Sequence, residues 1–593
     1  MILESHEGAL RAVAAPMDGV QVWVSGHATA QTSHQADDQA TLQVSSRTGR
    51  RVSIIIKVAL GAAVGYWHPR AGIERTLVPD WAGGGAVSAI DSAPMGVLYD
   101  LLGDVVFWFA SDSLVTVTNL AWGVAEEDGT FTLAIDGAIG SGASVTVRLG
   151  RGGHLATVVG EVAEWMQGLV GRRPLPVPPQ ARRPVYSTWY AYHEAVDQRA
   201  LQTESHEAAE LGFGSVFLDF GWQLHGDSRY FDGCGDWYRD PAVFPDLADS
   251  VRRLRERNLD CVLWVAPLML GARSAASAAW ERFAPHYSES LRVRILDPRH
   301  REVREHIVQT CVRLMRDYGL AGLKIDFVDI AMAYANTPSA GDIDDVGAAM
   351  VEVFAQLTEA FRVNGWEKAY VEFRQPYVSP AMAPFGNIVR AGDCPGDAIA
   401  NRTSIVDARM FATDQAIHSD MVMWAADATP QAVAWQLFNT FFAVPQVSTR
   451  LAELAPGQRS VLRSFLRLWN VWGDVAARGM VTAPGSHSRY PVVRADGTDA
   501  RTVIVMYEPA PIILTGTENR VLLVNASGGR VAISRERGPA QTMRISTWDM
   551  FGTETANVTL TLSSAFVEIP IPSCGWAEIS MEAESYRLTG SDD

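Results

Sequence analysis

The chain has 593 residues, too many for one ordinary hydrophobic core, so we expect several domains. Its composition, 48% apolar and 20% charged, is that of a globular protein. The net charge of −17 argues against nucleic acid and against an anionic membrane as partners, because both attract basic patches, and it suits a neutral ligand.

Cysteine spacing and the first residues set further limits. The five cysteines are scattered, without a C-x-x-C or metal-type histidine pair, so we predict no disulfide framework, no metal site and no cofactor. Met1 to Glu7 have neither the basic nor the apolar segment of a signal peptide, and no apolar run reaches the roughly 18 residues of a membrane helix. We therefore expect a soluble cytoplasmic protein. A precursor trimmed before this start and a homo-oligomer both stay open.

Residues 1–170 are predicted to form an antiparallel β-sandwich. Short alternating runs, such as Arg51 to Val58 and Ser144 to Leu149, are separated by Gly, Asp and Ser, which is typical of this architecture. Residues 171–184 contain five prolines in fourteen positions and can continue neither a helix nor a sheet, so we predict a stiff linker there.

Between residues 185 and 478 the pattern changes to alternating strands and helices, with predicted helices at 196–211, 300–317 and 346–363. Eight such strands predict a (β/α)8 TIM barrel as the catalytic domain. The expected strands are residues 185–190, 215–219, 261–266, 322–326, 369–374, 387–391, about 417–423 and about 440–447. Short strands return in residues 479–593, which we predict to form a small C-terminal β-sandwich domain.

Polar and aromatic residues follow seven of these expected strands, at the end where the mouth of a TIM barrel lies. The fourth strand, Gly322-Leu-Lys-Ile-Asp326, carries Lys324 and Asp326 inside an otherwise apolar run. A buried charge requires a partner or a purpose. The pattern therefore predicts either a salt bridge at the strand end or a catalytic group.

The mixture of side chains at the strand ends favours a sugar as ligand. Aromatic faces stack on the apolar face of a pyranose, and carboxylates accept hydrogen bonds from its hydroxyls. Glycoside cleavage requires two carboxyl groups flanking the anomeric carbon, and Asp326 and Asp393 end the fourth and sixth strands. A G-x-S-x-G elbow near a strand end and a G-x-G-x-x-G loop are both absent, which argues against a serine hydrolase and an NAD-dependent glycosidase.

Several motifs in residues 185–475 resemble those of one known family. They are Phe217-Leu-Asp-Phe-Gly-Trp222, Gly235-Asp-Trp-Tyr-Arg-Asp240, Leu296-Asp-Pro-Arg-His300, Gly322-Leu-Lys-Ile-Asp326, and Asp393 ahead of Asp397-Ala-Ile-Ala-Asn-Arg402. In order and spacing the set is similar to that of the α-galactosidases of glycoside hydrolase family 36, with families 27 and 31 more distant. The order of the three predicted domains agrees with this resemblance.

The resemblance implies a retaining glycosidase that releases terminal α-D-galactose from an oligosaccharide or other glycoside. Asp326 would be the nucleophile and Asp393 the acid/base, with Asp397 as the rival for the second role. Binding of the sugar would involve several charged and aromatic side chains. We expect these to be Asp219, Lys324, Glu372, Arg374, Arg390, Cys394 and Asp397, with Trp189, Trp222 and Trp264 as apolar walls.

Three departures from the family pattern touch the sugar subsite. Phe220 stands where a second acid is usual, Glu372 to Tyr377 replaces a Cys-Ser-x-Gly-Gly loop, and the loop from Asp393 to Asp397 is one residue longer. A glycosidase or transglycosylase for a related sugar (an α-glucoside, an α-N-acetylgalactosaminide or a β-L-arabinopyranoside) therefore stays open. An inactive carbohydrate-binding barrel is the third hypothesis.

Overall fold

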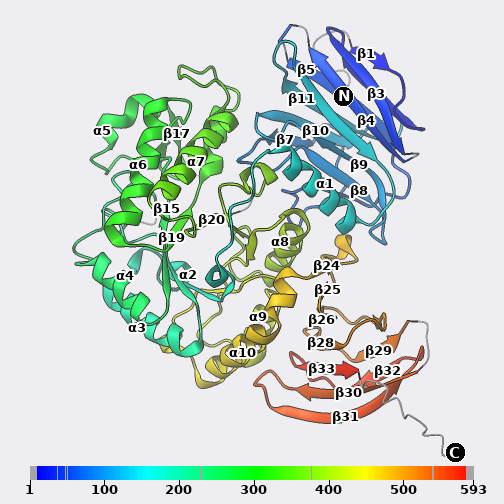
Figure 1. The fold of residues 1–593 in the computed structure, drawn as a ribbon, viewed down its shortest axis with the longest axis vertical. Helices are drawn as coiled ribbons and strands as arrows, with labels where there is room; N and C mark the ends of the chain where they lie inside the picture. Colours follow the sequence, from blue (N-terminus) through cyan, green and yellow to red (C-terminus); the bar gives the residue numbers. More distant parts are fainter. Residues whose placement is uncertain are drawn as a thin grey trace, which may run out of the picture. The chain divides into compact units, whose positions relative to one another are not determined.

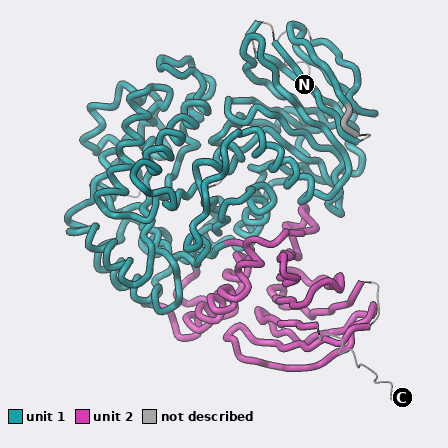
Figure 2. Tube along the Cα trace, viewed as in Figure 1, with its two compact units in different colours: residues 1–423, 444–453 teal, residues 424–443, 454–593 magenta. Residues whose placement is uncertain are grey.

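The computed structural model describes residues 10–36, 38–46, 48–49, 51–227, 230–374, 377–536 and 540–581. Its chain forms two compact units, coloured separately in Figure 2. Unit 1 comprises Met1–Met423 and Val444–Glu453, and unit 2 comprises Trp424–Ala443 and Leu454–Asp593. Within the described ranges, no helix is both long and apolar enough to cross a membrane. Met1 to Glu7, on which the leader argument rests, lie outside these ranges.

Unit 1 begins with two six-stranded antiparallel sheets (Figure 1). The first has the order β1 (Leu10–Val13), β2 (Val20–Ser25), β5 (Arg51–Ala59), β11 (Thr130–Ala138), β10 (Thr118–Val124) and β7 (Gly83–Val87). The second has the order β3 (Ala28–Ala36), β4 (Gln39–Ser46), β12 (Ser144–Gly150), β9 (Val105–Ser111), β8 (Met95–Tyr99) and β6 (Gly65–Trp67).

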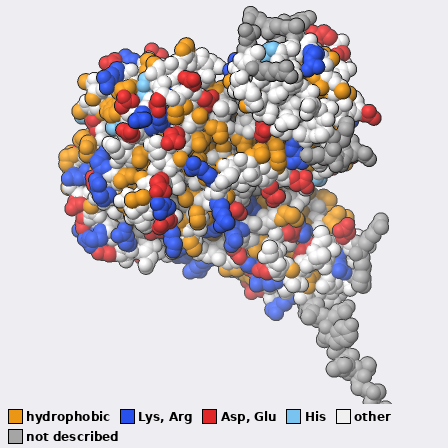
Figure 3. Space-filling view, turned by 45° about the horizontal axis from the view of Figure 1, so that its top comes forward, with side chains coloured by type: hydrophobic (Ala, Val, Ile, Leu, Met, Phe, Trp, Pro, Cys, Tyr) orange, Lys and Arg blue, Asp and Glu red, His pale blue; other side chains and the backbone are white. Residues whose placement is uncertain are grey.

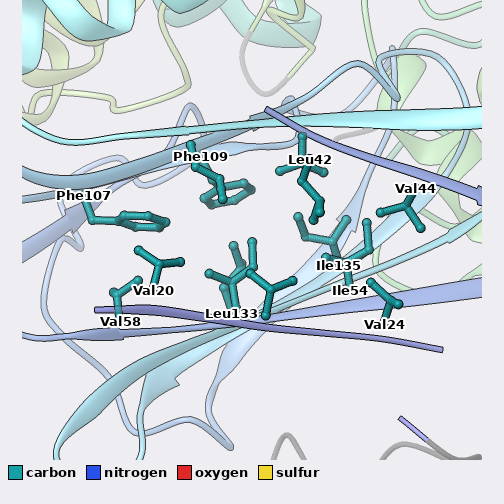
Figure 4. Close-up of a cluster of buried hydrophobic side chains, with 14 of the residues drawn as sticks. Val20, Val24, Leu42, Val44, Ile54, Val58, Phe107, Phe109, Leu133 and Ile135 are labelled. Carbon is teal, nitrogen blue, oxygen red and sulfur yellow. The ribbon is translucent and has the colours of Figure 1, made fainter. Parts of the chain in front are cut away.

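The alternation read from the sequence explains why these two sheets pack together. Ile54 and Ile56 of β5 point into the core between the sheets, whereas Ile55 belongs to a small cluster with Ala134. Successive side chains of a strand point to opposite faces, so one strand supplies both clusters. Figure 4 shows the core, to which Phe107 and Phe109 contribute from the second sheet.

A helix, α1 (Leu155–Leu169), follows the sandwich within the range predicted to be strands. Its buried residues recur with helical spacing and include Leu155, Val158, Val159 and Val162. The short helix η1 (Pro179–Arg182) then leads into the barrel.

Eight parallel strands form the barrel of unit 1. In space their order is β22 (Ala416–His418), β21 (Ile388–Arg390), β20 (Tyr370–Arg374), β19 (Gly322–Ile325), β15 (Asp260–Val265), β14 (Ser215–Leu218), β13 (Val185–Ser187) and β23 (Gln446–Val447). A parallel bridge between His418 and Val444 joins the last strand to the first and closes the barrel.

Helices connect the barrel strands and lie on their outer side in Figure 1. The helices of unit 1 after α1 are α2 (Trp189–Tyr192), α3 (Gln198–Leu211), α4 (Leu247–Glu256), α5 (Ser277–Trp280), α6 (Arg301–Tyr318), α7 (Val346–Val363) and α8 (Ala398–Phe411). Four of the longer helices start at an aspartate whose carboxylate accepts a backbone N–H three residues on, which satisfies one exposed donor of the first turn. These caps are Asp197, Asp246, Asp345 and Asp397.

Smaller elements complete unit 1. A three-stranded sheet after β15 consists of β16 (Met269–Gly271), β18 (Val293–Ile295) and β17 (His286–Ser288). The short 3-10 helices are η2 (His193–Ala195), η3 (Glu281–Phe283), η4 (Val328–Tyr334), η5 (Pro380–Met382) and η6 (Leu451–Glu453).

The sandwich is tied to barrel helix α8 by a buried aspartate. Asp407 of α8 accepts a hydrogen bond from Trp67 Nε1 at 3.0 Å and an ion pair from Arg75 at 2.5 Å. Both donors belong to the N-terminal sheets or their loops, so the first and central parts of unit 1 share a polar anchor.

Unit 2 contains two helices, α9 (Pro430–Phe438) and α10 (Pro456–Arg478), and two sheets. The larger sheet has the order β24 (Met480–Thr482), β25 (Val492–Asp496), β26 (Arg501–Met506), β28 (Arg520–Asn525), β33 (Trp576–Met581), β30 (Gln541–Trp548) and β31 (Glu554–Leu562). The smaller has the order β27 (Ile512–Leu514), β29 (Val531–Arg535) and β32 (Val567–Ile569), and η7 (Ser486–Ser488) follows β24.

The predicted fold class is confirmed: an N-terminal sandwich, a central eight-stranded parallel barrel with helices, and C-terminal sheets. The strands β26 and β28 pair in parallel, so the C-terminal part is a mixed and not a purely antiparallel structure. The exact domain boundaries at 170, 184 and 478 stay predictions. On the face seen in Figure 3, acidic and basic side chains are interspersed.

Candidate active site

The carboxyl ends of the barrel strands carry the candidate side chains. Asp219 follows β14, Asp326 follows β19, and Arg374 and Arg390 are the last residues of β20 and β21. Asp393 lies three residues after β21. The strands β14, β15, β19, β20 and β21 are consecutive in the barrel, so these side chains gather at one part of its mouth.

The carboxylate of Asp326 is held by donors from three parts of the barrel. Its Oδ1 accepts from Arg374 Nε at 2.5 Å and from the Tyr377 hydroxyl at 3.2 Å. The backbone N–H of Phe327 donates to the same oxygen at 2.8 Å. Its Oδ2 accepts from the indole N–H of Trp264 at 3.0 Å. Oδ1 is thus saturated with donors, and Oδ2 keeps a lone pair for another group.

The electrostatic surroundings keep Asp326 ionised. Burial of the carboxyl acts to raise its pKa. Three cations, on Arg374, Lys324 and Arg390, outweigh burial and hold the pKa of Asp326 well below its usual range. Asp326 is therefore a carboxylate over the whole physiological pH range.

Lys324 and Asp219 form a buried ion pair. Lys324 Nζ donates to Asp219 Oδ2 at 2.6 Å, and both side chains are at most 5% exposed. Burial acts to lower the pKa of Lys324, but the neighbouring carboxylates, led by Asp219, raise it above its usual value. The ammonium group therefore stays charged close to Asp326.

Arg390 connects two further carboxylates. Its Nη1 donates to Asp420 Oδ1 at 2.5 Å and its Nη2 to Asp393 Oδ1 at 2.8 Å. Asp420 is fully buried, whereas the side chain of Asp393 is 52% exposed. Asp420 Oδ2 also accepts from the backbone N–H of Cys394 at 2.8 Å and from the Tyr190 hydroxyl at 3.1 Å. Asp393 and the adjacent Cys394 are therefore both bound to the Arg390–Asp420 ion pair, which holds their loop in place.

Opposing charges act on Asp393. Burial acts to raise its pKa, the Arg390 guanidinium lowers it, and the negative charge of Asp326 raises it. The net effect is a pKa below the usual value, so Asp393 is ionised in this state. Arg390 links the two carboxylates, because it donates to Asp393 and its charge also lowers the pKa of Asp326. The negative charge of Asp326 in turn raises the pKa of Asp393, so the two carboxylates belong to one site.

The rival acid, Asp397, has a structural partner. Its carboxylate caps α8 by accepting the backbone N–H of Ala400 at 2.9 Å. Cys394, also predicted to contact substrate, supplies its backbone N–H to Asp420, and burial raises the pKa of its thiol. These contacts account for both residues without a ligand, and their contact with a sugar stays a prediction.

Two predicted sugar-binding residues are buried. Glu372 is 1% exposed, and its Oε2 accepts from Gln446 Nε2 at 2.6 Å. Trp222 is fully buried and donates its indole N–H to the carbonyl oxygen of Trp264 at 3.0 Å. Trp222 thus has a packing role, whereas Glu372 lies among polar groups and its Oε1 is buried without a hydrogen-bond partner among the described residues, and the contact of both with substrate stays a prediction.

Phe220, which stands where a second acid was expected, packs into an aromatic cluster. Its ring lies edge-on to Trp264 at 5.5 Å, to Phe231 at 5.2 Å and to Trp189 at 6.2 Å between ring centroids. Trp189 is half-buried and also contacts His193 at 4.9 Å. An apolar wall therefore stands next to the Asp219–Lys324 pair.

Sequence reasoning missed two side chains that bind Asp326 or its neighbour Arg390. Tyr377 bonds Asp326, and Asp420 bonds the arginine that holds Asp393. Both lie in motifs that follow predicted strands, but their partners are distant in sequence. Gln375 and Pro376, within the unusual segment before Tyr377, lie outside the described residues.

Comparison with known proteins gives distant relatives. No family model matches the chain. It is 29% identical over 201 residues to the probable α-galactosidase G of Emericella nidulans, covering 31% of this chain and 27% of that protein. It is 24% identical over 216 residues to the myogenesis-regulating glycosidase of Mus musculus, covering 35% and 27%. The matches thus span only about a quarter of the length of these curated relatives.

Solved structures match over far more of the chain. A variant of AgaA, a GH36 α-galactosidase from Geobacillus stearothermophilus with 1-deoxygalactonojirimycin, has a TM-score of 0.63 at 14% identity. That match covers 97% of this chain and 83% of AgaA. The α-galactosidase TtGalA from Thermus thermophilus has a TM-score of 0.53 at 18% identity, covering 80% of this chain and 96% of its own. The chain therefore has the GH36 α-galactosidase fold across nearly its whole length.

Proposed function

We propose that this chain is a retaining, exo-acting α-glycoside hydrolase that releases terminal α-D-galactose by double displacement. The observation that carries the proposal is the arrangement around Asp326. This carboxylate is kept ionised by Arg374 and is oriented by Trp264. Its negative charge raises the pKa of the half-exposed Asp393. Two carboxyl groups of this kind are what glycoside cleavage requires.

In the first step, Oδ2 of Asp326 attacks the anomeric carbon. Oδ1 already accepts three hydrogen bonds, so Oδ2 has the available lone pair. The bond between the anomeric carbon and the leaving oxygen breaks as the bond to Oδ2 forms. The leaving oxygen takes its electron pair and the proton of Asp393, and a glycosyl-enzyme ester remains.

Asp393 must be protonated for the first step and ionised for the second. A sugar over Asp393 removes water from it, which raises its pKa while Asp326 is still negatively charged. Forming the ester removes that negative charge, so one of the influences that raise the pKa of Asp393 disappears. Arg390 then favours the carboxylate, which takes a proton from water as the water oxygen attacks the anomeric carbon and releases Asp326.

The choice of galactose rests on the relatives. Curated relatives include a probable α-galactosidase G and an α-galactosidase 2 from Pediococcus pentosaceus. Structures of this fold include AgaA variants in complex with stachyose and with raffinose. These names support terminal α-galactosides as the first substrates to test.

A second sugar is favoured by one residue. Phe220 presents an aromatic ring where a second acid was expected. A site that does not bond the C6 hydroxyl has little reason to reject a sugar without it. β-L-arabinopyranosides are therefore the second candidate substrates.

The test begins with hydrolysis of 4-nitrophenyl α-D-galactopyranoside, followed by proton NMR of the first sugar released. Retention predicts that α-galactose appears before mutarotation. Asp326→Ala should lose nearly all turnover, and azide should restore it with formation of β-galactosyl azide. The proposal would be contradicted if Asp326→Ala turned over substrate as fast as the unaltered chain. It would also be contradicted if β-galactose were the first product.

A further inference from the structure

A cavity of about 330 Å³ opens in the N-terminal sandwich, on parts of the chain that the proposed active site does not use. Its walls come from both sheets and from the loops beside them. The lining residues are Tyr66, His68, Arg70, Gly84, Gly85, Ala86, Val87, Ser92, Ala93, Met95, Leu120 and Trp122. The volume lies in the range of small-ligand pockets.

Glycines of β7 leave this space open. Among the described strands β7 is an edge of its sheet, with the sequence Gly-Gly-Gly-Ala-Val (Figure 1). Gly83, Gly85 and Val87 alternate with the others and share one face, and Val87 belongs to the sandwich core. The core therefore continues along this face up to the glycines.

The two glycines on the Val87 face have different surroundings, since Gly83 is half-buried and Gly85 is exposed. A Cβ at Gly83 would lie 2.6 Å from the indole nitrogen of Trp122, so packing requires glycine there. At Gly85 no described heavy atom lies within 4 Å of that position. A larger side chain would fit at residue 85, and glycine inside a strand weakens it. Gly85 therefore leaves this exposed part of the cavity wall without a side chain.

The aromatic wall of the cavity consists of rings that are tilted against one another, and Trp122 contacts both of the others. The rings of Tyr66 and Trp122 lie 5.4 Å apart and those of His68 and Trp122 lie 4.9 Å apart. Trp122 is half-buried, so part of its ring remains open to the cavity. One face of a pyranose ring carries only C–H groups and suits such a wall.

The polar groups at the rim match a neutral ligand with hydroxyls. Arg70 lines the cavity with a side chain that is 52% exposed, and its guanidinium donates to the Asp91 carboxyl at 2.7 Å. His68 carries no charge at neutral pH, because burial, with help from Arg70 and Arg75, lowers its pKa to about 4. Among these lining residues Arg70 is thus the one cation at neutral pH, and the cavity offers hydrogen-bond donors to hydroxyls.

We infer that this cavity is a second, non-catalytic binding site for one sugar unit of a neutral glycan. The sugar would stack on the half-buried Trp122 over Gly85, with its hydroxyls toward Arg70, while the buried Tyr66 packs against the Trp122 ring. The choice of a sugar among neutral ligands rests on the proposed glycosidase function. Such a site would hold a longer substrate on the enzyme without taking part in bond cleavage.

The test measures binding of raffinose to the Asp326→Ala chain by saturation-transfer NMR and titration, with 1-deoxygalactonojirimycin present in excess to occupy the active site. We expect raffinose still to bind. Gly85→Leu fills the cavity and should weaken this binding at least tenfold, as should Trp122→Ala. Gly168→Leu is the matched control, because Gly168 also has open space around its Cβ position, lies on α1 and is outside the cavity.

Two further measurements separate the outcomes. In chains with Asp326 intact, Gly85→Leu and Gly168→Leu should hydrolyse 4-nitrophenyl α-galactoside alike, and the melting temperature of Gly85→Leu should be equal or higher. Absence of hydrolysis in all chains refutes the proposed function and leaves the binding test valid. The second site would be refuted if 1-deoxygalactonojirimycin displaced all bound raffinose or if Gly85→Leu and Gly168→Leu bound raffinose equally. Displacement of raffinose by 4-nitrophenol would refute it as well.

Discussion

Replacement of Arg374 by Met tests whether a cation keeps the nucleophile ionised. Arg374 Nε lies 2.5 Å from Asp326 Oδ1, and the two side chains are 13% and 9% exposed. A charge pair at about 4 Å is worth about 4 kcal/mol at an effective dielectric constant of 20, or about 3 pH units. Lys324 and Arg390 remain and water enters the gap, so we expect the pKa of Asp326 to rise by about 1–3 units.

The direction of the pH effect follows from the role of Asp326. Its ionised form attacks, so activity is present above its pKa and is lost as the pH falls through it. A raised pKa therefore moves the acidic limb of kcat/KM for 4-nitrophenyl α-galactoside to higher pH. Arg316→Met, at a side chain that is 65% exposed, is the control and should leave the profile unchanged.

Two results would refute this reasoning. A uniform fall of kcat/KM with an unmoved acidic limb would mean that Arg374 acts through substrate binding alone. A shift of the limb to lower pH would mean that the titrating group is not a carboxylate stabilised by Arg374. Arg374→Lys gives an intermediate reference, because it keeps the charge and loses the guanidinium geometry.

Three other predictions concern the acid, the sugar and stability. Asp393→Asn should lower turnover about 10²–10⁴-fold for alkyl galactosides and far less for aryl leaving groups. Asp397→Ala should lower the free energy of unfolding by about 0.5–2 kcal/mol, because a helix cap is lost, and should show no dependence on the leaving group. The reverse pattern would exchange the roles of the two residues. The nitrophenyl β-L-arabinopyranoside should be hydrolysed at a rate comparable with the α-galactoside, and a preference for galactose above about a thousandfold would show that another group bonds the C6 hydroxyl. Burial raises the pKa of Asp91 to about 7, so with rising pH the unfolded chain loses this proton before the folded chain does. The free energy of unfolding should therefore fall by up to about 4 kcal/mol as the pH rises from about 4 to 7. Asp91→Asn should reduce this pH dependence in melting curves, and an unchanged pH dependence would exclude Asp91 as its source.

The barrel was readable from the sequence because its strands are short apolar runs between helices. Lys324 and Asp326 stood out for the same reason, as charges in a run that should be buried. The later strands were predicted too long: residues 417–423 and 440–447 contain only β22 and β23. Apolar residues there pack in loops around the barrel, and hydrophobicity alone does not distinguish such loops from strands.

The contacts within the site were less readable, because they join strands that are distant along the chain. Asp219 pairs with Lys324 across 105 residues, and Trp264 reaches Asp326 across 62. Sequence motifs indicate which side chains gather at the barrel mouth, but the pairing depends on strand register and rotamers. The helix α1 is different, since its helical spacing was present in the sequence and the surrounding strand patterns obscured it.

The anchor at Asp407 has a consequence for how the sequence can evolve or be engineered. Asp407 lies on α8, the helix that begins directly after the Asp393 loop, and the donors Trp67 and Arg75 that bind it belong to the sandwich region. Removing both donors would take a hydrogen bond and an ion pair from a buried carboxylate, which costs several kcal/mol. The sandwich therefore cannot be replaced by that of another protein without regard to these contacts. A replacement must supply its own indole and guanidinium at these positions, so the two regions are bound to change together.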